Sequence, residues 1–311
     1  MNAGGILVVR LGAMGDIIHT LPAAVSLKRS FPASRVVWAI EEKWAPLLEG
    51  NPFVDQLEFV NRRKLAAVLQ LRSRLRAARY DLAVDFQGLI KSALVAAFAR
   101  PERICGWHRS VAREPLAALF YSATVIPKSA HVVDRNLELA AATGATSIGA
   151  SFPLPQGRPE GELPRGPFIL ANPLAGWVSK QWPLKSYSEI GRRLAGAGFT
   201  LVLNGSEPID APCAVSHVSG LPGLIDATRR AAAVIGVDSG PLHLAAALGK
   251  PGVAIFGPTD PIRNGPCGGT IRVLRSSDAQ TSYKRRPEID SSMRAISPAD
   301  VWAALKDQLG L

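Results

Sequence analysis

The chain is poor in several features that mark particular classes of protein. It has only three cysteines, Cys105, Cys213 and Cys267, and their odd number and wide spacing fit neither a disulfide framework nor a zinc site. Aromatic residues make up 6% of the chain, and no base-stacking motif appears. No segment reaches the ~18 uninterrupted apolar residues of a membrane span, and the N-terminus lacks the pattern of a signal peptide. We therefore expect a protein of the reducing cytoplasm with no membrane span.

The charges that are present favour acidic partners. The 36 Lys and Arg residues outnumber the 25 Asp and Glu residues, which gives a net charge of +11 and a pI of about 10.0. Such a surplus attracts nucleic acid, an anionic membrane surface or a phosphorylated substrate. Charge alone does not choose among them, and a basic surface kept for solubility remains open.

Strand-like and helix-like segments alternate along the chain, which predicts an α/β protein with parallel sheets covered on both faces. In the N-terminal half, the strand-like segments are residues 6–9, 35–40, 55–60, 81–85 and 104–106, and the helix-like ones are 22–30, 43–49, 63–79 and 89–99. After a proline-rich connector at 151–167 the alternation restarts, with strands at 168–171, 200–203, 233–237, 252–256 and 271–274 and helices at 184–197, from about 241, and at 298–309.

We therefore predict two Rossmann-like, doubly wound domains, residues 1–155 and 156–311. Ligands of such sheets bind beyond the carboxyl ends of the strands, so we expect a site in a cleft between the domains. Ser297 is the expected cap of the last helix, and that helix either stays with its own domain or packs back on the first.

The stretch "GAMGD", which ends at Asp16, follows the first strand. Its glycines allow a tight turn and a close approach of the backbone to a ligand. An acid at a helix start is stabilised by backbone N–H groups and by the helix dipole. Spacing alone leaves Asp16 open between a helix cap and a general base.

Three further stretches follow strands in the second half. "NPLAGWVSKQWP" combines a glycine loop with Lys180, which suits a pyrophosphate, although its spacing is not that of a Walker loop. "VDSGPLHLAAALGKP" places Ser239 and Pro241 at a helix start that can bind an anion, with His243 one turn on. "FGPTDP" is a turn in which Thr259 could contact a phosphate. Each stretch also has an interpretation without a ligand. Lys180 could be a solvated surface lysine, His243 a structural histidine and "FGPTDP" a plain loop.

A last group consists of basic residues in the first half. It comprises Arg62, Arg63, Lys64, Lys91, Arg113 and Arg135. Such residues usually form a solvated face, but if they converge they would cradle phosphates or carboxylates.

Together, "MGDIIHTLPA", "DFQGLIKSA", "AREPLAALFY", "KQWP", "DSGPLHLAAALGKP" and "FGPTDP" resemble glycosyltransferase family 9, the bacterial lipopolysaccharide heptosyltransferases. The resemblance runs over nearly the whole chain, and "AREPLAALFY" is most similar to the heptosyltransferase I branch. It implies a GT-B fold, with an acceptor-binding first domain and a nucleotide-sugar-binding second domain. It also implies inverting transfer of heptose from ADP-heptose to a Kdo hydroxyl of Kdo2-lipid A, with no metal or other cofactor.

The resemblance also implies roles for individual residues. Asp16 is expected as the catalytic base and Lys180 as the lysine facing the donor phosphates. The donor-binding residues are expected to be Gly12, Ala13, Gly15, Ala175, Gly176, Asp238, Ser239, Gly240 and His243, and the acceptor-binding residues Arg62, Arg63, Lys64, Arg113 and Arg135. A lipid-linked anionic acceptor accounts for the basic charge and implies a monomer peripheral to the cytoplasmic face of the inner membrane.

Some features depart from the family pattern and keep alternatives open. The segment between Gly205 and Asp238 is short, and no ribose ligand can be assigned in it. "TSYKRRPEIDSSM" lacks the cysteines that many relatives carry there, which argues against a metal site. The alternatives are heptosyltransferase II, a family 9 enzyme with another nucleotide sugar or acceptor, a GT-B epimerase and, in another class, a polyanion-binding module.

Overall fold

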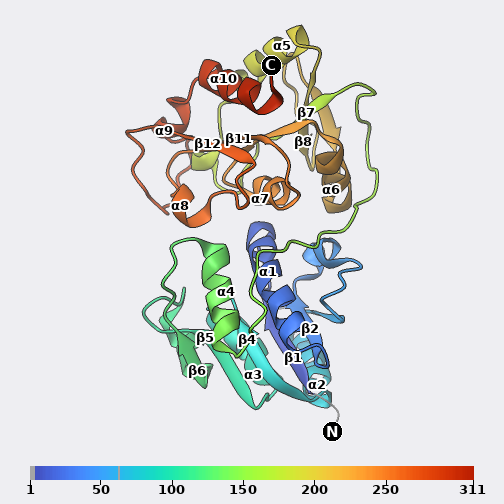
Figure 1. Cartoon of the computed structure of the whole chain (residues 1–311), viewed down its shortest axis with the longest axis vertical. Helices are drawn as coiled ribbons and strands as arrows, with labels where there is room; N and C mark the ends of the chain where they lie inside the picture. The colour runs from blue at the N-terminus through green and yellow to red at the C-terminus, as the bar shows by residue number, and fades with distance from the viewer. Residues whose placement is uncertain (1–3, 62–63) are drawn as a thin grey trace. The chain divides into compact units, whose positions relative to one another are not determined.

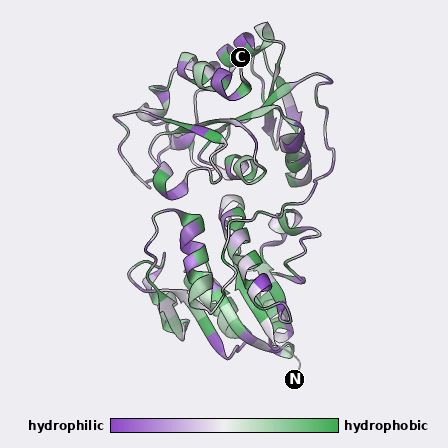
Figure 2. Cartoon of the chain, viewed as in Figure 1, coloured by the Kyte–Doolittle hydropathy of each residue, from purple (hydrophilic) through white to green (hydrophobic). Residues whose placement is uncertain are grey.

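The computed structural model describes residues 4–61 and 64–311 of the chain. The chain forms two compact units, Met1–Pro155 (unit 1) and Gln156–Leu311 (unit 2). Each unit contains one six-stranded parallel sheet with helices packed against it, as the alternation predicts (Figure 1). Apolar residues dominate the central strands of both sheets (Figure 2), as expected for strands that are buried on both faces.

Unit 1 alternates strands and helices from its first strand. Its strands are β1 (Gly5–Val9), β2 (Arg35–Ile40), β3 (Gln56–Phe59), β4 (Tyr80–Asp85), β5 (Arg103–Trp107) and β6 (Ala123–Val125). Its helices are α1 (Met14–Ser30), α2 (Leu65–Ala77), α3 (Ile90–Phe98) and α4 (Val132–Ala142), with 3₁₀ helices η1 (Glu42–Leu48) and η2 (Pro115–Phe120). The strand order is β3-β2-β1-β4-β5-β6, the Rossmann order.

Helix α1 begins eight residues before the predicted start at 22, because Pro22 lies inside the helix rather than at its first turn. Twelve of its 17 residues are buried. The side chain of Asn136 on α4 donates to the backbone oxygen of His19 at 3.0 Å. Tertiary burial and this contact with α4 outweigh the cost of a proline within the helix.

Unit 2 repeats the same topology. Its strands are β7 (Phe168–Asn172), β8 (Thr200–Gly205), β9 (Val215–Val218), β10 (Ala233–Val237), β11 (Gly252–Phe256) and β12 (Ile271–Arg275). Its helices are η3 (Val178–Lys180), α5 (Leu184–Gly196), α6 (Leu221–Arg230), α7 (Gly240–Ala247), α8 (Pro261–Asn264), α9 (Ser291–Arg294) and α10 (Pro298–Leu309). The strand order, β12-β11-β10-β7-β8-β9, again places the first and fourth strands of the unit side by side.

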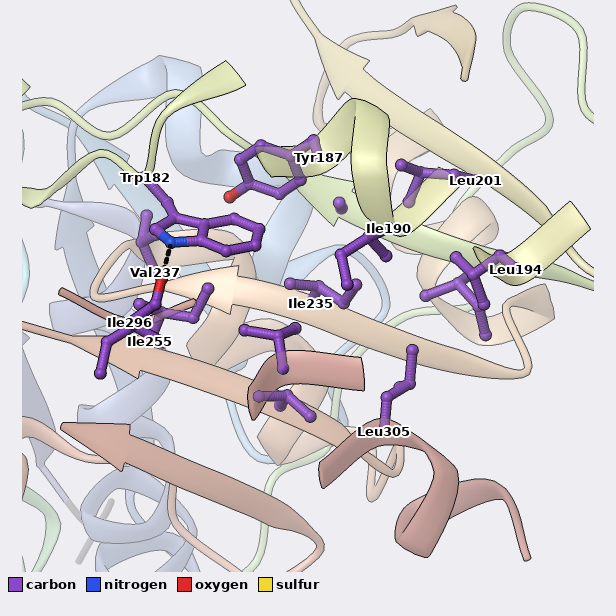
Figure 3. Packing of buried hydrophobic residues seen from close by; sticks show 14 of the residues in the cluster. Trp182, Tyr187, Ile190, Leu194, Leu201, Ile235, Val237, Ile255, Ile296 and Leu305 are labelled. Carbon is purple, nitrogen blue, oxygen red and sulfur yellow. Dashed lines mark hydrogen bonds between the residues drawn. The ribbon is translucent and has the colours of Figure 1, made fainter. Parts of the chain in front are cut away.

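The core of unit 2 lies between its sheet and the helices α5 and α10 (Figure 3). Trp182 is fully buried there, and its indole N–H donates to the backbone oxygen of Ile296 at 2.9 Å. The ring of Tyr187 meets that of Trp182 edge to face, 5.0 Å between centroids. Helix α10 packs against α5, β11 and β12, and the hydroxyl of Ser297 caps it by accepting from the backbone N–H of Asp300.

The sequence reading missed several elements of different lengths, namely η2, β6, α4, η3, β9, α6, α8 and α9. The proline-rich connector has no regular structure, yet it is anchored to unit 2. The backbone oxygen of Glu160 lies 2.6 Å from Nε2 of His217, and its carboxylate accepts from the backbone N–H of Gly220 at 2.7 Å. These contacts tie the connector to β9 and to the start of α6.

Candidate functional site

In each sheet the strand order reverses between the first and fourth strands, which are β1 and β4 in unit 1 and β7 and β10 in unit 2. Ligands of open parallel sheets bind at this switch point, beyond the carboxyl ends of the strands. Three of the four motifs that follow strands begin there, at Arg10 after β1, at Asn172 ending β7 and at Asp238 after β10. The two switch points are therefore the candidate site regions of the two units.

Asp16 lies in the first turn of α1. The sequence left it open between a helix cap and a general base, and at this position the two roles are compatible. One carboxylate oxygen accepts from the backbone N–H of Ala13 at 3.2 Å, as a helix cap does. The other oxygen lies 2.7 Å from the guanidinium of Arg10. The Asp16 side chain keeps a third of its surface exposed, whereas Arg10 is buried. The carboxylate is thus fixed on two sides and still open to solvent.

Arg10 is a functional candidate that the sequence reading missed. It follows β1 directly, and its guanidinium also donates to the backbone oxygen of Phe86, which follows β4. The backbone N–H of Leu11 donates to the side chain of Gln87 at 2.8 Å. These bonds tie the loop that carries Asp16 to the turn after β4, across the switch point.

That turn is organised by Asp85, the last residue of β4. Its buried carboxylate accepts from the backbone N–H groups of Gln87 and Gly88, at 2.9 and 3.3 Å, and from the hydroxyls of Ser92 and Tyr121, at 2.8 and 2.7 Å. Burial raises the pKa of Asp85, and these four hydrogen bonds oppose the rise. Asp85 is therefore a structural anchor for the turn.

The same turn joins the motifs "DFQGLIKSA" and "AREPLAALFY". Tyr121 reaches Asp85 from the end of η2, and Glu114 accepts from the backbone N–H of Ile90 at 2.7 Å. The backbone N–H of Glu114 donates to the oxygen of Gly88 at 3.0 Å. A β-carbon on Gly106 would come within 2.4 Å of the Tyr121 ring, so the ring needs glycine at that position. The two motifs form one packed unit beside the Asp16 loop.

In unit 2 the switch point carries a buried ion pair. Nζ of Lys180 lies 2.6 Å from Oδ2 of Asp238, and Nε2 of His243 lies 3.4 Å from Oδ1 of the same carboxylate. Burial alone would raise the pKa of Asp238, but the hydrogen bond from His243 and the charge of Lys180 outweigh it and hold the pKa well below its usual range. Asp238 is thus ionised and fixes the Lys180 ammonium at the end of β10.

Polar groups surround this lysine. Nζ of Lys180 lies 4.4 Å from the centroid of the Trp177 ring, and the guanidinium of Arg285 lies 5.3 Å from the same ring, so two cations share one aromatic side chain. The hydroxyls of Ser179, Ser239 and Thr259 are buried without a protein partner in the described part of the chain. They belong to the loops after three adjacent strands, β7, β10 and β11. Buried donors of this kind suit an oxygen-rich ligand such as a diphosphate.

The remaining predicted donor residues lie in the expected loops. Gly12, Ala13 and Gly15 surround the start of α1, where a β-carbon on Gly12 would come within 2.7 Å of the indole nitrogen of Trp44. The backbone oxygen of Ala175 accepts from the side chain of Gln181 at 3.2 Å, and Gly176 is exposed next to it. Gly240 is the first residue of α7, directly after the Ser239 cap.

The predicted acceptor residues are spread over several elements of unit 1. Lys64 precedes α2, Arg113 is exposed before η2, and Arg135 on α4 stacks its guanidinium 5.7 Å from the Trp107 ring. Arg62 and Arg63 lie outside the described residues. Among the described residues, no group of His, Cys, Asp and Glu side chains could hold a metal ion, and no helix is long and apolar enough to cross a bilayer.

Two parallel six-stranded sheets with Rossmann strand order, each with polar residues at its switch point, define the GT-B class of glycosyltransferases. The solved structure of E. coli heptosyltransferase WaaC with ADP matches this fold with a TM-score of 0.76 at 26% identity, covering 97% of this chain and 99% of that one.

The sequence comparisons identify the family. The family model of glycosyltransferase family 9 (heptosyltransferase) matches residues 68–292. Lipopolysaccharide heptosyltransferase 1 of Escherichia coli strain K12 is 32% identical over 302 residues, which cover 87% of this chain and 93% of the relative. The same enzyme of Pseudomonas aeruginosa is 30% identical over 287 residues, covering 82% and 79%. The chain belongs to glycosyltransferase family 9, as its motifs predict.

Proposed function

We propose that this glycosyltransferase moves heptose from ADP-heptose to Kdo2-lipid A, by an inverting transfer, on the cytoplasmic face of the inner membrane. The relatives named lipopolysaccharide heptosyltransferase 1 support the sugar and the pathway. The single observation that carries the chemistry is the partly exposed Asp16 carboxylate, held by Arg10 and by the backbone of Ala13 at the switch point of unit 1.

Asp16 acts as the general base on the attacking hydroxyl. An inverting transfer needs one proton acceptor on the nucleophile, and a positioned carboxylate contributes roughly 10²–10⁴-fold to the rate. Arg10 and the Ala13 N–H hold the carboxylate in one orientation. Asp85 remains a structural residue, because its carboxylate is fully buried and already accepts four hydrogen bonds.

Lys180 stabilises the negative charge that develops on the departing ADP. The ion pair with Asp238 holds its ammonium at the end of β10, where α7 begins. The buried hydroxyls of Ser239 and Thr259 belong to the loops after β10 and β11. A fixed cation and helix-start N–H groups are the usual partners of a leaving diphosphate.

We assign the ribose contact to Glu207. It is exposed in the loop after β8 and is the first acid beyond the second strand of the nucleotide-binding unit. In dinucleotide-binding folds an acidic residue reached after the first βα unit binds the ribose hydroxyls. The short segment after Gly205 thus still offers a carboxylate at the carboxyl edge of the sheet.

A product assay with ADP-heptose and Kdo2-lipid A tests the proposal, comparing the wild type with Asp16→Asn and Lys180→Ala. We expect Asp16→Asn to lower kcat by about 10³-fold while ADP-heptose binding persists, since only the base is lost. We expect Lys180→Ala to weaken both ADP-heptose binding and turnover. Near-normal turnover by Asp16→Asn would refute the base, and preferential binding of a UDP- or GDP-sugar in a thermal-shift assay would refute the donor.

A further inference from the structure

One face of the unit 1 sheet is covered by a layer of three helices, α2, α3 and η2. Leu71 and Leu75 of α2 and Val95 and Ala96 of α3 belong to the same buried cluster under the sheet, and η2 packs against α3. Helices α1 and α4 pack against each other in the same unit. The layer of α2, α3 and η2 thus has one buried side and one side turned away from the core.

The outer side of this layer exposes large apolar side chains. The exposed fractions are 75% for Leu65, 54% for Leu69, 38% for Leu94, 60% for Leu116 and 80% for Leu119. By contrast, α1 and α4, which lie entirely within the described residues, expose no large hydrophobic side chain. A cluster of this kind on one layer marks an interaction surface, whereas scattered single residues do not.

Helix geometry brings these leucines onto common stripes. Leu65 and Leu69 are four residues apart on α2, and the same stripe continues to Arg72, whose guanidinium lies 6.0 Å from the ring of Phe98 on α3. The stripe therefore borders α3, which carries Leu94. Leu116 and Leu119 are three residues apart on a 3₁₀ helix, where such side chains eclipse each other. We call the five side chains the leucine layer.

The helices that carry the leucine layer are positively charged. Their described residues include four cations and no Asp or Glu; the cations are Arg72, Arg74, Arg76 and Lys91. Arg74 pairs with Glu58 of β3 at 2.9 Å, so its charge is compensated within the unit. Helices α1 and α4, in contrast, each contain at least one acid, Asp16 on α1 and Asp134 and Glu138 on α4. Apolar residues flanked by Lys and Arg are the composition of surfaces that lie in the headgroup region of anionic membranes.

We propose that the leucine layer docks unit 1 on an anionic phospholipid bilayer. A second copy of the chain fits this face less well, because a two-fold interface would bring the cations of this face against the same cations of the other copy, and the face has no Asp or Glu on its helices to pair with them. The docking proposal rests on the proposed function in one respect only: docking would bring the enzyme to a lipid-linked acceptor. Docking itself is a property of the surface and is measured without donor or acceptor.

Sedimentation with vesicles of phosphatidylglycerol and phosphatidylethanolamine, and with pure phosphatidylcholine vesicles, tests the proposal. We expect binding to the anionic vesicles that weakens as salt is added. The double variants Leu65→Gln/Leu69→Gln and Leu116→Gln/Leu119→Gln should each lower the partition coefficient by about tenfold, because two apolar side chains no longer enter the interface. Arg76→Gln should lower it about fivefold through the lost charge.

Ile148→Gln is the matched control, because Ile148 is an exposed residue of the same unit outside the leucine layer. It should bind vesicles like the wild type. Unchanged unfolding temperatures of all variants will show that binding, and not folding, has changed. Equal vesicle binding by the double variants and Ile148→Gln would overturn the proposal, as would a concentration-dependent dimer in sedimentation velocity that the double variants abolish.

An activity assay separates this proposal from the proposed function. With an acceptor fragment that lacks its acyl chains, Leu65→Gln/Leu69→Gln should transfer heptose at the wild-type rate, because α2 carries neither of the motifs that pack beside the Asp16 loop. With acceptor in vesicles this variant should be slower. If the wild type transfers no heptose but still binds anionic vesicles, the proposed function fails and the docking surface stands.

Discussion

Replacing Asp238 by Asn removes the carboxylate charge at the centre of unit 2 while preserving the shape of the side chain. The Asp238 side chain is 6% exposed and the Lys180 side chain 16% exposed, so the pair is largely shielded from water. Breaking one partner of a buried pair costs ~3–5 kcal/mol. Because Lys180 can regain some hydration, we expect a loss of about 2–3 kcal/mol in the free energy of unfolding. For a unit of this size that corresponds to a fall in Tm of roughly 5–10 °C.

Thermal unfolding followed by circular dichroism measures this loss, with Asp307→Asn as the control. Asp307 pairs with Arg272 in the same unit, but both side chains are at least half exposed, so its replacement should cost less than about 1 kcal/mol. A fall in Tm for Asp238→Asn no larger than that for Asp307→Asn would refute the argument that burial makes the Lys180 pair strong. Asp238→Asn should also raise the KM for ADP-heptose, because Lys180 loses the carboxylate that holds its ammonium in position.

The pH dependence of the same variant follows from the pKa of Asp238. Because the folded state holds this pKa below its usual value of 3.8, the ionised carboxylate stabilises the fold. That contribution is fully present above the unfolded pKa and is lost as the pH falls below it toward the folded pKa. The difference in stability between wild type and Asp238→Asn should therefore be constant from pH 7 to about pH 5 and shrink at lower pH. A difference that grows on acidification would contradict this sign.

Three further changes probe the Asp16 side of the chain. Tyr121→Phe removes one hydroxyl from the buried Asp85 carboxylate and should lower the free energy of unfolding by about 1–3 kcal/mol in urea denaturation; a loss no greater than that of Tyr283→Phe, an exposed control, would disprove it. Gly12→Ala should displace Trp44 and lower kcat about tenfold, because its β-carbon would approach the indole nitrogen to 2.7 Å; wild-type turnover would show that the loop tolerates the shift. Arg10→Gln should lower kcat about 10–100-fold with little change in the KM for ADP-heptose, because Asp16 loses its orienting partner; a larger effect on KM would place Arg10 in donor binding instead.

Local sequence patterns predicted the regular elements correctly where the spacing of apolar residues matches the buried positions and a cap residue marks the helix end. The strands at 233–237 and 252–256 and the last helix at 298–309, with its Ser297 cap, lie where the apolar runs and the cap residue indicate. The start of α1 was wrong, because the proline signal at Pro22 suggested a helix start and long-range burial decided otherwise. The elements η2 and β6 are short, and their polar connections carry little periodic signal. Helix α6 does carry apolar residues at helical spacing, a signal that the sequence reading did not use.

The sequence by itself determined the α/β class, the family motifs and the residue types of the two candidate sites, because these depend on local patterns. Only the tertiary structure decided how the motifs combine. Arg10 reaches Phe86 and Lys180 meets Asp238 because the first and fourth strands of each sheet lie side by side. Tyr121 reaches Asp85 because η2 packs against α3 and β5. Tyr121–Asp85 and Lys180–Asp238 join residues 36 and 58 positions apart, a separation at which no local pattern specifies a partner.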